Sequence, residues 1–233
     1  MIKGYLFDYG GTLDTAGCHW GKMLWHAYQR QHVGVEEQAF RDAYVYAERT
    51  LGSQPIIRPQ DTFHRTLDVK IRLEMEWLCT SGAWNADGNM FDRQHAAVLD
   101  DVYNKVLGIT AHSRSVLAQL QEAGYPMVLV SNFYGNVETV LHEFGFDTFF
   151  QDVVESAVVG IRKPDSRIWS EGVKRLRLPA EDVMVVGDSF YKDIEPALKA
   201  GCHATWLKGE GWTDKRYDET IPDKVITDLE QLL

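Results

Sequence analysis

The stretch FDYGGTLD at residues 7–14 decides the fold that we expect for this chain. Apolar residues lead into it and indicate a buried strand over residues 3–8. Because this strand stops on a carboxylate and then breaks into Gly-Gly-Thr, it places Asp8 at its C-terminal end, where open α/β sheets bind ligands. Aspartate also serves as a covalent nucleophile, notably through an aspartyl-phosphate. Asp8 is therefore a candidate nucleophile, although Asp and Gly also suit an ordinary turn.

Length and composition indicate a soluble globular chain with a sizeable core. The chain has 233 residues, of which 45% are hydrophobic and 25% charged, enough for one large domain or a core with an insert. No window approaches eighteen consecutive apolar residues, so we expect no membrane span. The three cysteines, Cys18, Cys79 and Cys202, are widely spaced, and the N-terminus lacks the pattern of a secretory leader. Both features favour a cytoplasmic location with reduced thiols.

The formal net charge of -10 restricts the partners that we expect. Such a surface repels nucleic acid and anionic membranes, and no run of five Lys or Arg offsets it. An anionic small molecule remains compatible, provided that a metal ion and a few placed cations neutralise its site locally. The sequence does not indicate an oligomeric state.

Two patterns of hydrophobic spacing divide the chain. Over residues 19–105 apolar residues recur at three- and four-residue intervals, as on amphipathic helices. From about residue 110 helical and strand patterns alternate, which is typical of βαβ units and a parallel sheet. We expect helices over 113–123, 136–144, 165–176 and 194–200, and strands over 127–131, 149–154, 183–187, 204–207 and 224–226. The first strand joins this sheet because it is too short to stand alone, so a helical insert interrupts an α/β core.

Polar residues follow two of these elements where a phosphate could bind. The strand over 127–131 ends in Ser131-Asn132, a hydroxyl followed by backbone N–H groups at a helix start, which can hold a phosphate oxygen. The same residues also cap helices without any catalytic role. Lys163 precedes the helix that begins near residue 166 and can reach an anionic intermediate as a point charge, although most lysines are simply exposed.

The segment GDSFYKD at residues 187–193 carries two further carboxylates at the end of a strand. Mg²⁺ prefers oxygen ligands and takes one or two carboxylates together with substrate phosphate. Asp8 and Asp188 at adjacent strand ends supply such ligands, with Asp193 close by. Crowded carboxylates repel one another, and a cation relieves that repulsion.

In these motifs, their order and their spacing, the chain resembles the haloacid dehalogenase-like (HAD) hydrolase superfamily over essentially its whole length. The residues that carry the resemblance are Asp8 and Thr12 of the first motif, Ser131 of the second, Lys163 of the third, and Gly187, Asp188 and Asp193 of the fourth. The resemblance implies an α/β fold with a Rossmann-like parallel sheet core, formed by residues 1–15 and 108–233. It also implies that residues 16–107 form an inserted helical cap domain.

The resemblance further implies an activity and a set of roles. The expected reaction is Mg²⁺-dependent hydrolysis of a small phosphorylated metabolite through an aspartyl-phosphate on Asp8. Ser131 and Lys163 are expected to hold the phosphoryl oxygens, with Thr12 and Asn132 contributing to substrate binding. The expected metal ligands are Asp8, the carbonyl of Gly10, Asp188 and Asp193.

Gly10 departs from the family pattern. Phosphatases of the family carry a second Asp two residues after the nucleophile, which protonates the leaving oxygen and then activates the hydrolytic water. General acid–base assistance is typically worth ~10²–10⁴-fold, so its loss matters for turnover. Asp14, His19 and Tyr9 lie close to Asp8 in the sequence and are candidate replacements. His19 is attractive because the unperturbed pKa of histidine is ~6.5.

Other branches of the superfamily leave alternatives open. Haloacid dehalogenases also lack the second Asp, but they lack the Gly-Asp of the fourth motif too, so Gly187-Asp188 argues against dehalogenation. Phosphonoacetaldehyde hydrolases carry Ala in place of that Asp, keep Mg²⁺ and use a cap lysine as a Schiff base, for which Lys22 and Lys70 are candidates here. The alternatives are thus a phosphonatase-like C–P hydrolase that uses a cap residue, and a non-catalytic phosphate-binding or regulatory protein.

Overall fold

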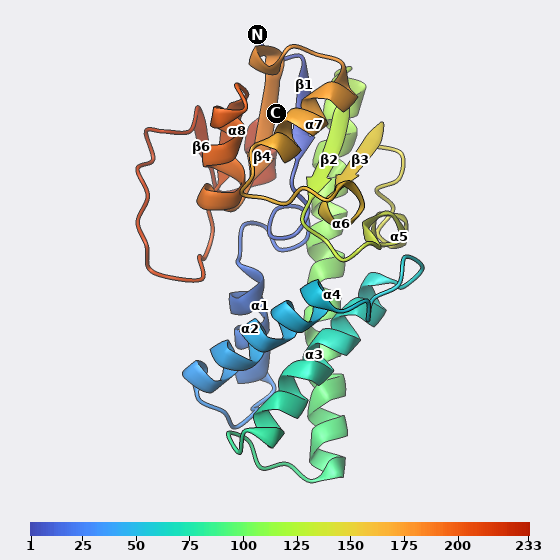
Figure 1. Ribbon diagram of the computed structural model, residues 1–233, viewed down its shortest axis with the longest axis vertical. Helices are drawn as coiled ribbons and strands as arrows, with labels where there is room; N and C mark the ends of the chain where they lie inside the picture. The colour runs from blue at the N-terminus through green and yellow to red at the C-terminus, as the bar shows by residue number, and fades with distance from the viewer.

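The computed structural model describes all 233 residues and places a six-stranded parallel sheet beside a lobe of helices (Figure 1). The strand order is β3-β2-β1-β4-β5-β6. The strands are β1 (Gly4–Phe7), β2 (Met127–Ser131), β3 (Asp152–Glu155), β4 (Val183–Gly187), β5 (His203–Leu207) and β6 (Lys224–Ile226). The predicted α/β class with a parallel sheet core is therefore confirmed, and β1 lies inside the sheet between β2 and β4.

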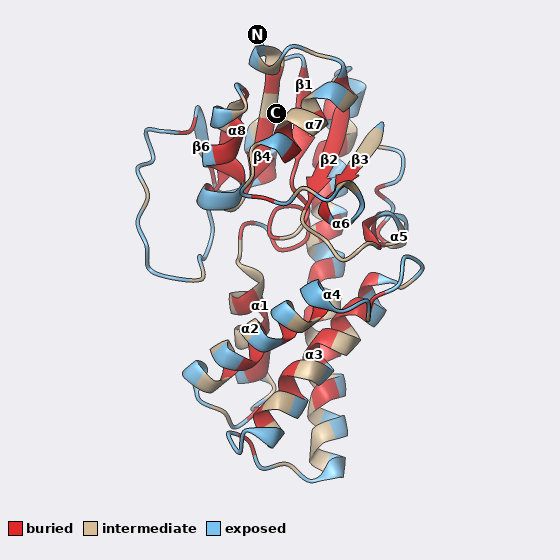
Figure 2. Cartoon of the chain, viewed as in Figure 1, coloured by how far each residue is buried: buried red, intermediate tan, exposed pale blue.

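The sheet is buried on both faces, which explains the nearly continuous apolar runs of its central strands. Successive side chains of a strand point to opposite faces, so Tyr5 and Phe7 pack in one hydrophobic cluster and Leu6 packs in another. In Figure 2 the central strands β1 and β2 are buried along their whole length, whereas the edge strands β3 and β6 are partly tan or pale blue. The core helices are α5 (Val137–Glu143), α6 (Ser156–Val159), α7 (Arg167–Leu176) and α8 (Glu195–Lys199), with short turns η1 (Ala180–Asp182), η2 (Phe190–Ile194) and η3 (Leu229–Leu232).

The helical lobe, which we call the cap, contains α1 (Trp20–Arg30), α2 (Glu37–Ser53), α3 (Phe63–Thr80) and the first part of α4 (Gly88–Glu122). Its helices bury their apolar stripes against one another, as the three- and four-residue spacing predicts. On α3, for example, Leu67, Ile71, Met75 and Leu78 are all buried. No helix in the structure combines the length and the apolar character needed to cross a bilayer.

Helix α4 differs from the sequence prediction. We expected a helix over 113–123, but α4 is one continuous helix of 35 residues that reaches from the far end of the cap to the sheet (Figure 1). Val106, Thr110 and Ser113 are buried in succession along it, so its packing continues through the junction without a break. The cap and the core therefore share this helix, and our division of the chain at residues 107 and 108 stays a prediction.

Glu74 gives the cap core a buried carboxyl whose ionisation costs stability. The side chain is fully buried; Oε2 accepts a 3.1 Å hydrogen bond from the Tyr28 hydroxyl, whereas Oε1 has no partner. Burial raises the pKa of Glu74 from 4.5 to about 8. The folded state therefore keeps a proton that the unfolded chain releases above its own pKa, and stability falls as the pH rises from about 4.5 to about 8, by up to ~1.4 kcal/mol per pH unit.

We expect Glu74→Gln to remove this loss, because glutamine keeps an acceptor for Tyr28 and cannot ionise. Urea unfolding at pH 5 and pH 8 measures the effect: the stability gain of the variant should be larger at pH 8. Glu76→Gln, at an exposed position of the same helix, is the matched control. An equal change in stability with pH for Glu74→Gln and the wild type would contradict the buried-carboxyl account.

Candidate active site

The predicted motif residues meet at the C-terminal edge of the sheet. Phe7 of β1 pairs with Leu129 of β2 and with Val186 of β4. Asp8, which follows Phe7, therefore lies at the same edge as the residues that end the two neighbouring strands. The strand order also reverses between β1 and β4, and ligands of such sheets bind at that switch point. The sequence alone predicted this convergence, because the ends of parallel strands share one edge.

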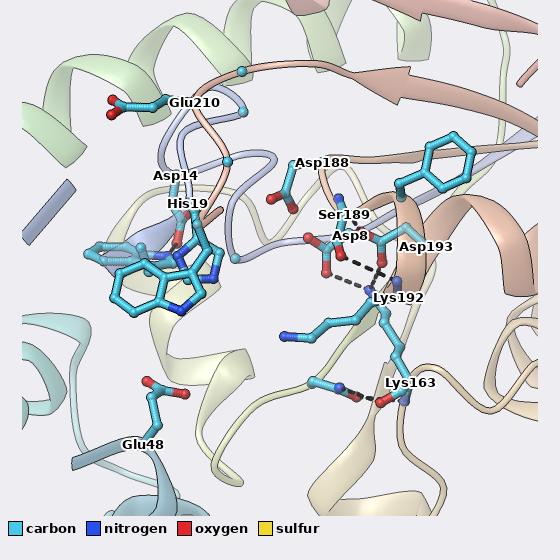
Figure 3. A pocket seen from close by; sticks show the side chains of 18 of the residues that line it. Asp8, Asp14, His19, Glu48, Lys163, Asp188, Ser189, Lys192, Asp193 and Glu210 are labelled. Atoms are coloured by element: carbon cyan, nitrogen blue, oxygen red, sulfur yellow. Dashed lines mark hydrogen bonds and ion pairs between the residues drawn. The ribbon is translucent and has the colours of Figure 1, made fainter. Parts of the chain in front are cut away.

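Lys163 joins two of the carboxylates. Its ammonium group donates to Asp8 Oδ1 at 2.5 Å and to Asp193 Oδ1 at 2.9 Å, and all three side chains are buried (Figure 3). Burial lowers the pKa of Lys163, but the charges of Asp193 and Asp8 outweigh that effect and raise the pKa overall. Lys163 therefore stays charged and holds the Asp8 carboxylate in place.

Asn132 fixes the backbone that carries this lysine. Its Oδ1 accepts from the Lys163 N–H at 3.0 Å, and its Nδ2 donates to the Lys163 carbonyl at 3.1 Å. Ser131, one residue earlier, has a buried hydroxyl without a hydrogen-bond partner. A phosphoryl oxygen would satisfy such a hydroxyl, whereas the Asn132 amide is already occupied with Lys163. The substrate contacts of Ser131 and Asn132 stay predictions.

Asp8, Asp188 and Asp193 form the candidate metal site. One oxygen from each lies within 4.8 Å of the others. Loss of surrounding water raises the pKa of Asp188 well above its usual value, and the charges of Asp193 and Asp8 raise it further. Lys163 pairs with two of these carboxylates, whereas Asp188 makes no ion pair, and this cluster of oxygen donors fits a divalent cation such as Mg²⁺.

The two adjacent glycines have different reasons to be there. Gly11 has φ +108°, and a Cβ at this position would lie 2.3 Å from Asp188 Oδ1, so only glycine allows Asp188 to approach the first motif. Thr12, which follows, donates to Asp8 Oδ2 at 3.0 Å. Gly10, in contrast, does not have a left-handed conformation, and its Cβ would meet nothing closer than Trp20 Nε1 at 3.7 Å. Position 10 therefore has room for a Cβ, and a metal contact from its carbonyl stays a prediction.

A cavity of about 470 Å³ opens between this edge and the cap. Its core side includes Asp8, Lys163, Asp188 and Asp193, whereas Ser131 and Thr12 are buried and do not line it. The cap side contributes an ion pair between the buried Lys70 and the half-buried Glu48, and the Tyr134 hydroxyl donates to Glu48 at 2.9 Å. Burial favours the neutral acid, but Lys70 lowers the pKa of Glu48 below its usual value. Of the two predicted cap lysines, Lys70 thus reaches the cavity, while Lys22 pairs with Glu37 at 3.2 Å instead.

The loop after β5 also contributes to the cavity, and the sequence pattern did not reveal it. Trp212 from this loop packs against the cap, with ring centroids 5.0 Å from both His19 and Tyr44. The guanidinium of Arg41 lies 3.9 Å over the Trp212 ring. The sequence analysis did not identify Glu48 either. Trp212 stands out in the sequence only as an aromatic residue in a glycine-rich loop, and such a loop has no periodicity from which its position could be predicted.

The three candidate replacements for the missing acid have different environments. Tyr9 is fully buried, and burial raises its pKa well above the usual value. Burial lowers the pKa of His19 to about 3, and its Nδ1 caps α1 by accepting from the Gly21 N–H at 3.0 Å. The ordinary histidine pKa that made His19 attractive is therefore wrong for this site. Asp14 remains, and its pKa is raised by burial to about 8.

Comparisons with known proteins identify the family of this chain. A model of the family described as haloacid dehalogenase-like hydrolase matches residues 2–201. Glyceraldehyde 3-phosphate phosphatase of Pyrococcus furiosus is 32% identical over 127 residues, which are 52% of this chain and 51% of that protein. The 5-amino-6-(5-phospho-D-ribitylamino)uracil phosphatase YigB of Escherichia coli (strain K12) is 26% identical over 117 residues, 50% of this chain and 47% of that protein. The chain thus spans about half the length of the curated relatives it matches.

Solved structures support the fold over the whole chain. A dehalogenase with an intermediate complex has a TM-score of 0.64 at 16% identity, and the match covers 99% of this chain and 95% of that one. The putative HAD-hydrolase YfnB of Bacillus subtilis, bound to magnesium, has a TM-score of 0.59 at 18% identity, with 99% and 96% covered. Because the family model matches residues 2–201, most of the sequence, the chain belongs to the haloacid dehalogenase-like hydrolase family.

Proposed function

We propose that this protein is a Mg²⁺-dependent phosphohydrolase that acts on a small phosphorylated metabolite through an aspartyl-phosphate on Asp8. The observation that carries the proposal is the buried cluster in which Lys163 holds Asp8 and Asp193 beside Asp188, at the base of a cavity. Two of the relatives reported above are phosphatases by name, which supports a phosphate ester as the substrate.

In the proposed reaction, an oriented carboxylate oxygen of Asp8 attacks phosphorus. Lys163 binds one of its oxygens and the Thr12 hydroxyl binds the other, so the carboxylate cannot rotate freely. Lys163 and the unpaired hydroxyl of Ser131 then bind phosphoryl oxygens, on which negative charge is spread in the transition state. Asp8, Asp188, Asp193 and the Gly10 carbonyl would hold Mg²⁺, which would supply positive charge that stabilises the phosphoryl oxygens.

Metal removal tests the proposal. We expect the purified protein to hydrolyse an aryl phosphate such as p-nitrophenyl phosphate, and EDTA to abolish this turnover until Mg²⁺ is restored. Asp188→Ala should lower turnover by ~10²–10³-fold, because it removes the carboxylate of the candidate metal site that makes no ion pair with the protein. Asp100→Ala, at an exposed position of α4, is the control. Turnover that resists both EDTA and Asp188→Ala would count against the metal site.

The position of Lys70 supports a second candidate function, phosphonate C–P hydrolysis, because Lys70 is a cap lysine that lines the cavity. A Schiff base requires a free amine, however, and the Lys70 amino group is engaged in an ion pair with Glu48. Borohydride trapping with phosphonoacetaldehyde separates the two candidates: a covalent adduct on Lys70 would support C–P hydrolysis. Phosphate binding without turnover of either substrate class would instead indicate the non-catalytic alternative.

A further inference from the structure

The room beside Gly10 and the carboxyl of Asp14 share one neighbour, the indole N–H of Trp20. A Cβ on Gly10 would lie 3.7 Å from Trp20 Nε1. The same nitrogen donates to Asp14 Oδ2 at 3.0 Å. The Trp20 indole N–H therefore faces position 10, where the family carries its second carboxylate. It also faces the carboxyl of Asp14, which this chain has instead.

Asp14 is also held at its other oxygen. Oδ1 accepts from the Gly11 N–H at 2.7 Å, so the carboxyl is fixed by the first motif on one side and by the first cap helix on the other. The residue is fully buried, yet it lines the cavity together with Asp8. Figure 3 labels Asp14 among the residues that line this pocket. The groups that face Asp14 are the N–H donors of Gly11 and Trp20 and the charge of Asp8.

The neighbouring polar groups are poorer proton donors. His19 has its Nδ1 occupied by the Gly21 N–H, and Tyr9 packs among aromatic rings of the core. Glu48 is tied to Lys70 in an ion pair. Burial of Asp14, strengthened by the charge of Asp8, raises its pKa to about 8, so near neutral pH it carries the proton that an acid must donate.

We propose that Asp14, held by Trp20 and Gly11, takes the place of the acid and base carboxyl that Gly10 lacks. This inference rests on the proposed phosphohydrolase function. An Asp8 oxygen bonds to phosphorus while the P–O ester bond breaks, its electron pair goes to the ester oxygen, and that oxygen takes the Asp14 proton directly or through one water. In the second step a water oxygen bonds to phosphorus, Asp14 accepts the proton of that water, and the bond from Asp8 to phosphorus breaks.

The experiment compares the wild type, Asp14→Asn, Gly10→Asp and the double variant on an aryl and an alkyl phosphate. An aryl phosphate leaves without much help from an acid, but its aspartyl-phosphate still needs a base for hydrolysis. Asp14→Asn should therefore release a burst of one equivalent of p-nitrophenol and then turn over slowly. On the alkyl ester it should lose ~10²–10⁴-fold in kcat with little change in KM. Gly10→Asp should restore the alkyl activity of Asp14→Asn, because position 10 has room and Trp20 can hold the new carboxylate.

The second variant, Trp20→Phe, keeps a ring but removes the N–H that orients Asp14. Trp20→Phe should reduce turnover of the alkyl phosphate more than the p-nitrophenol burst from the aryl phosphate. If thermal unfolding shows that Asp14→Asn is poorly folded, this variant still tests the role of Asp14. Equal losses on both esters, with no burst and no rescue by Gly10→Asp, would overturn the role of Asp14. A wild type that shows neither burst nor turnover would instead refute the phosphohydrolase function on which the inference rests.

Discussion

Asp8→Asn is expected to abolish turnover on every phosphate ester while leaving the fold intact. Asparagine lacks the anionic oxygen that forms the aspartyl-phosphate, so neither the first nor the second chemical step remains. The fold should survive, because Lys163 keeps its 2.9 Å contact with Asp193 when asparagine occupies position 8. Removing one of three crowded carboxylates also relieves repulsion at Asp188, where the charge of Asp8 raises the pKa.

Three measurements together check this prediction. Steady-state turnover and the p-nitrophenol burst should both disappear in Asp8→Asn, and the far-UV circular dichroism spectrum should match that of the wild type. Asp100→Asn, at an exposed position of α4, controls for a general effect of replacing an aspartate. Retained turnover in Asp8→Asn would refute the covalent mechanism, whatever its effect on Mg²⁺ binding.

Lys163→Met is expected to lower both activity and stability. A cation that stabilises the charge of a phosphoryl-transfer transition state is worth ~10³–10⁵-fold, so turnover should fall by about this factor. The substitution also leaves Asp8 and Asp193 buried without their counter-ion, since Lys163 is the ammonium group that contacts both. Removing one partner of a buried ion pair typically costs ~3–5 kcal/mol of unfolding free energy.

The stability loss should depend on pH and on metal. Burial raises the pKa of Asp193 to about 6 even though the charge of Lys163 lowers it, so removing Lys163 should raise this pKa further, and the stability loss should shrink as the pH falls from 8 to 5. Added Mg²⁺ should recover part of it by binding the freed carboxylates. Urea unfolding at both pH values, with and without Mg²⁺, measures these effects. Lys174→Met, which removes an exposed ion pair with Glu171, should change stability little, and an equal loss in both variants would contradict the buried cluster.

The predicted convergence of the motif residues depended on a simple property of parallel sheets. Asp8, Ser131 and Asp188 are far apart in the sequence, but each follows a buried apolar run that forms a strand. Parallel strands end at one edge, so the order of apolar runs and polar ends was enough to bring these residues together. Lys163 could be included only through the family resemblance, since a lysine before a helix is ordinary on its own.

Helix α4 and His19 show where local pattern was not enough. The apolar spacing of residues 88–122 is helical throughout, but only packing against both the cap and the sheet decides that one helix continues across the junction. His19 looked like a group that titrates near neutral pH. The structure buries it beside Trp212, about two hundred residues away in the sequence, and that burial lowers its pKa to about 3.

The sequence by itself determined the class of fold, the helical nature of the insert and the edge of the sheet at which the site lies, because hydrophobic periodicity and strand ends are local properties. Only the tertiary structure decided which cap and loop residues complete the cavity, among them Glu48, Lys70 and Trp212. Tertiary structure also decided that Gly10 leaves room beside Trp20 and that Asp14 shares that indole N–H. The physical reason is that burial and cross-chain contacts set the pKa and the orientation of a side chain, and both arise only when distant segments pack together.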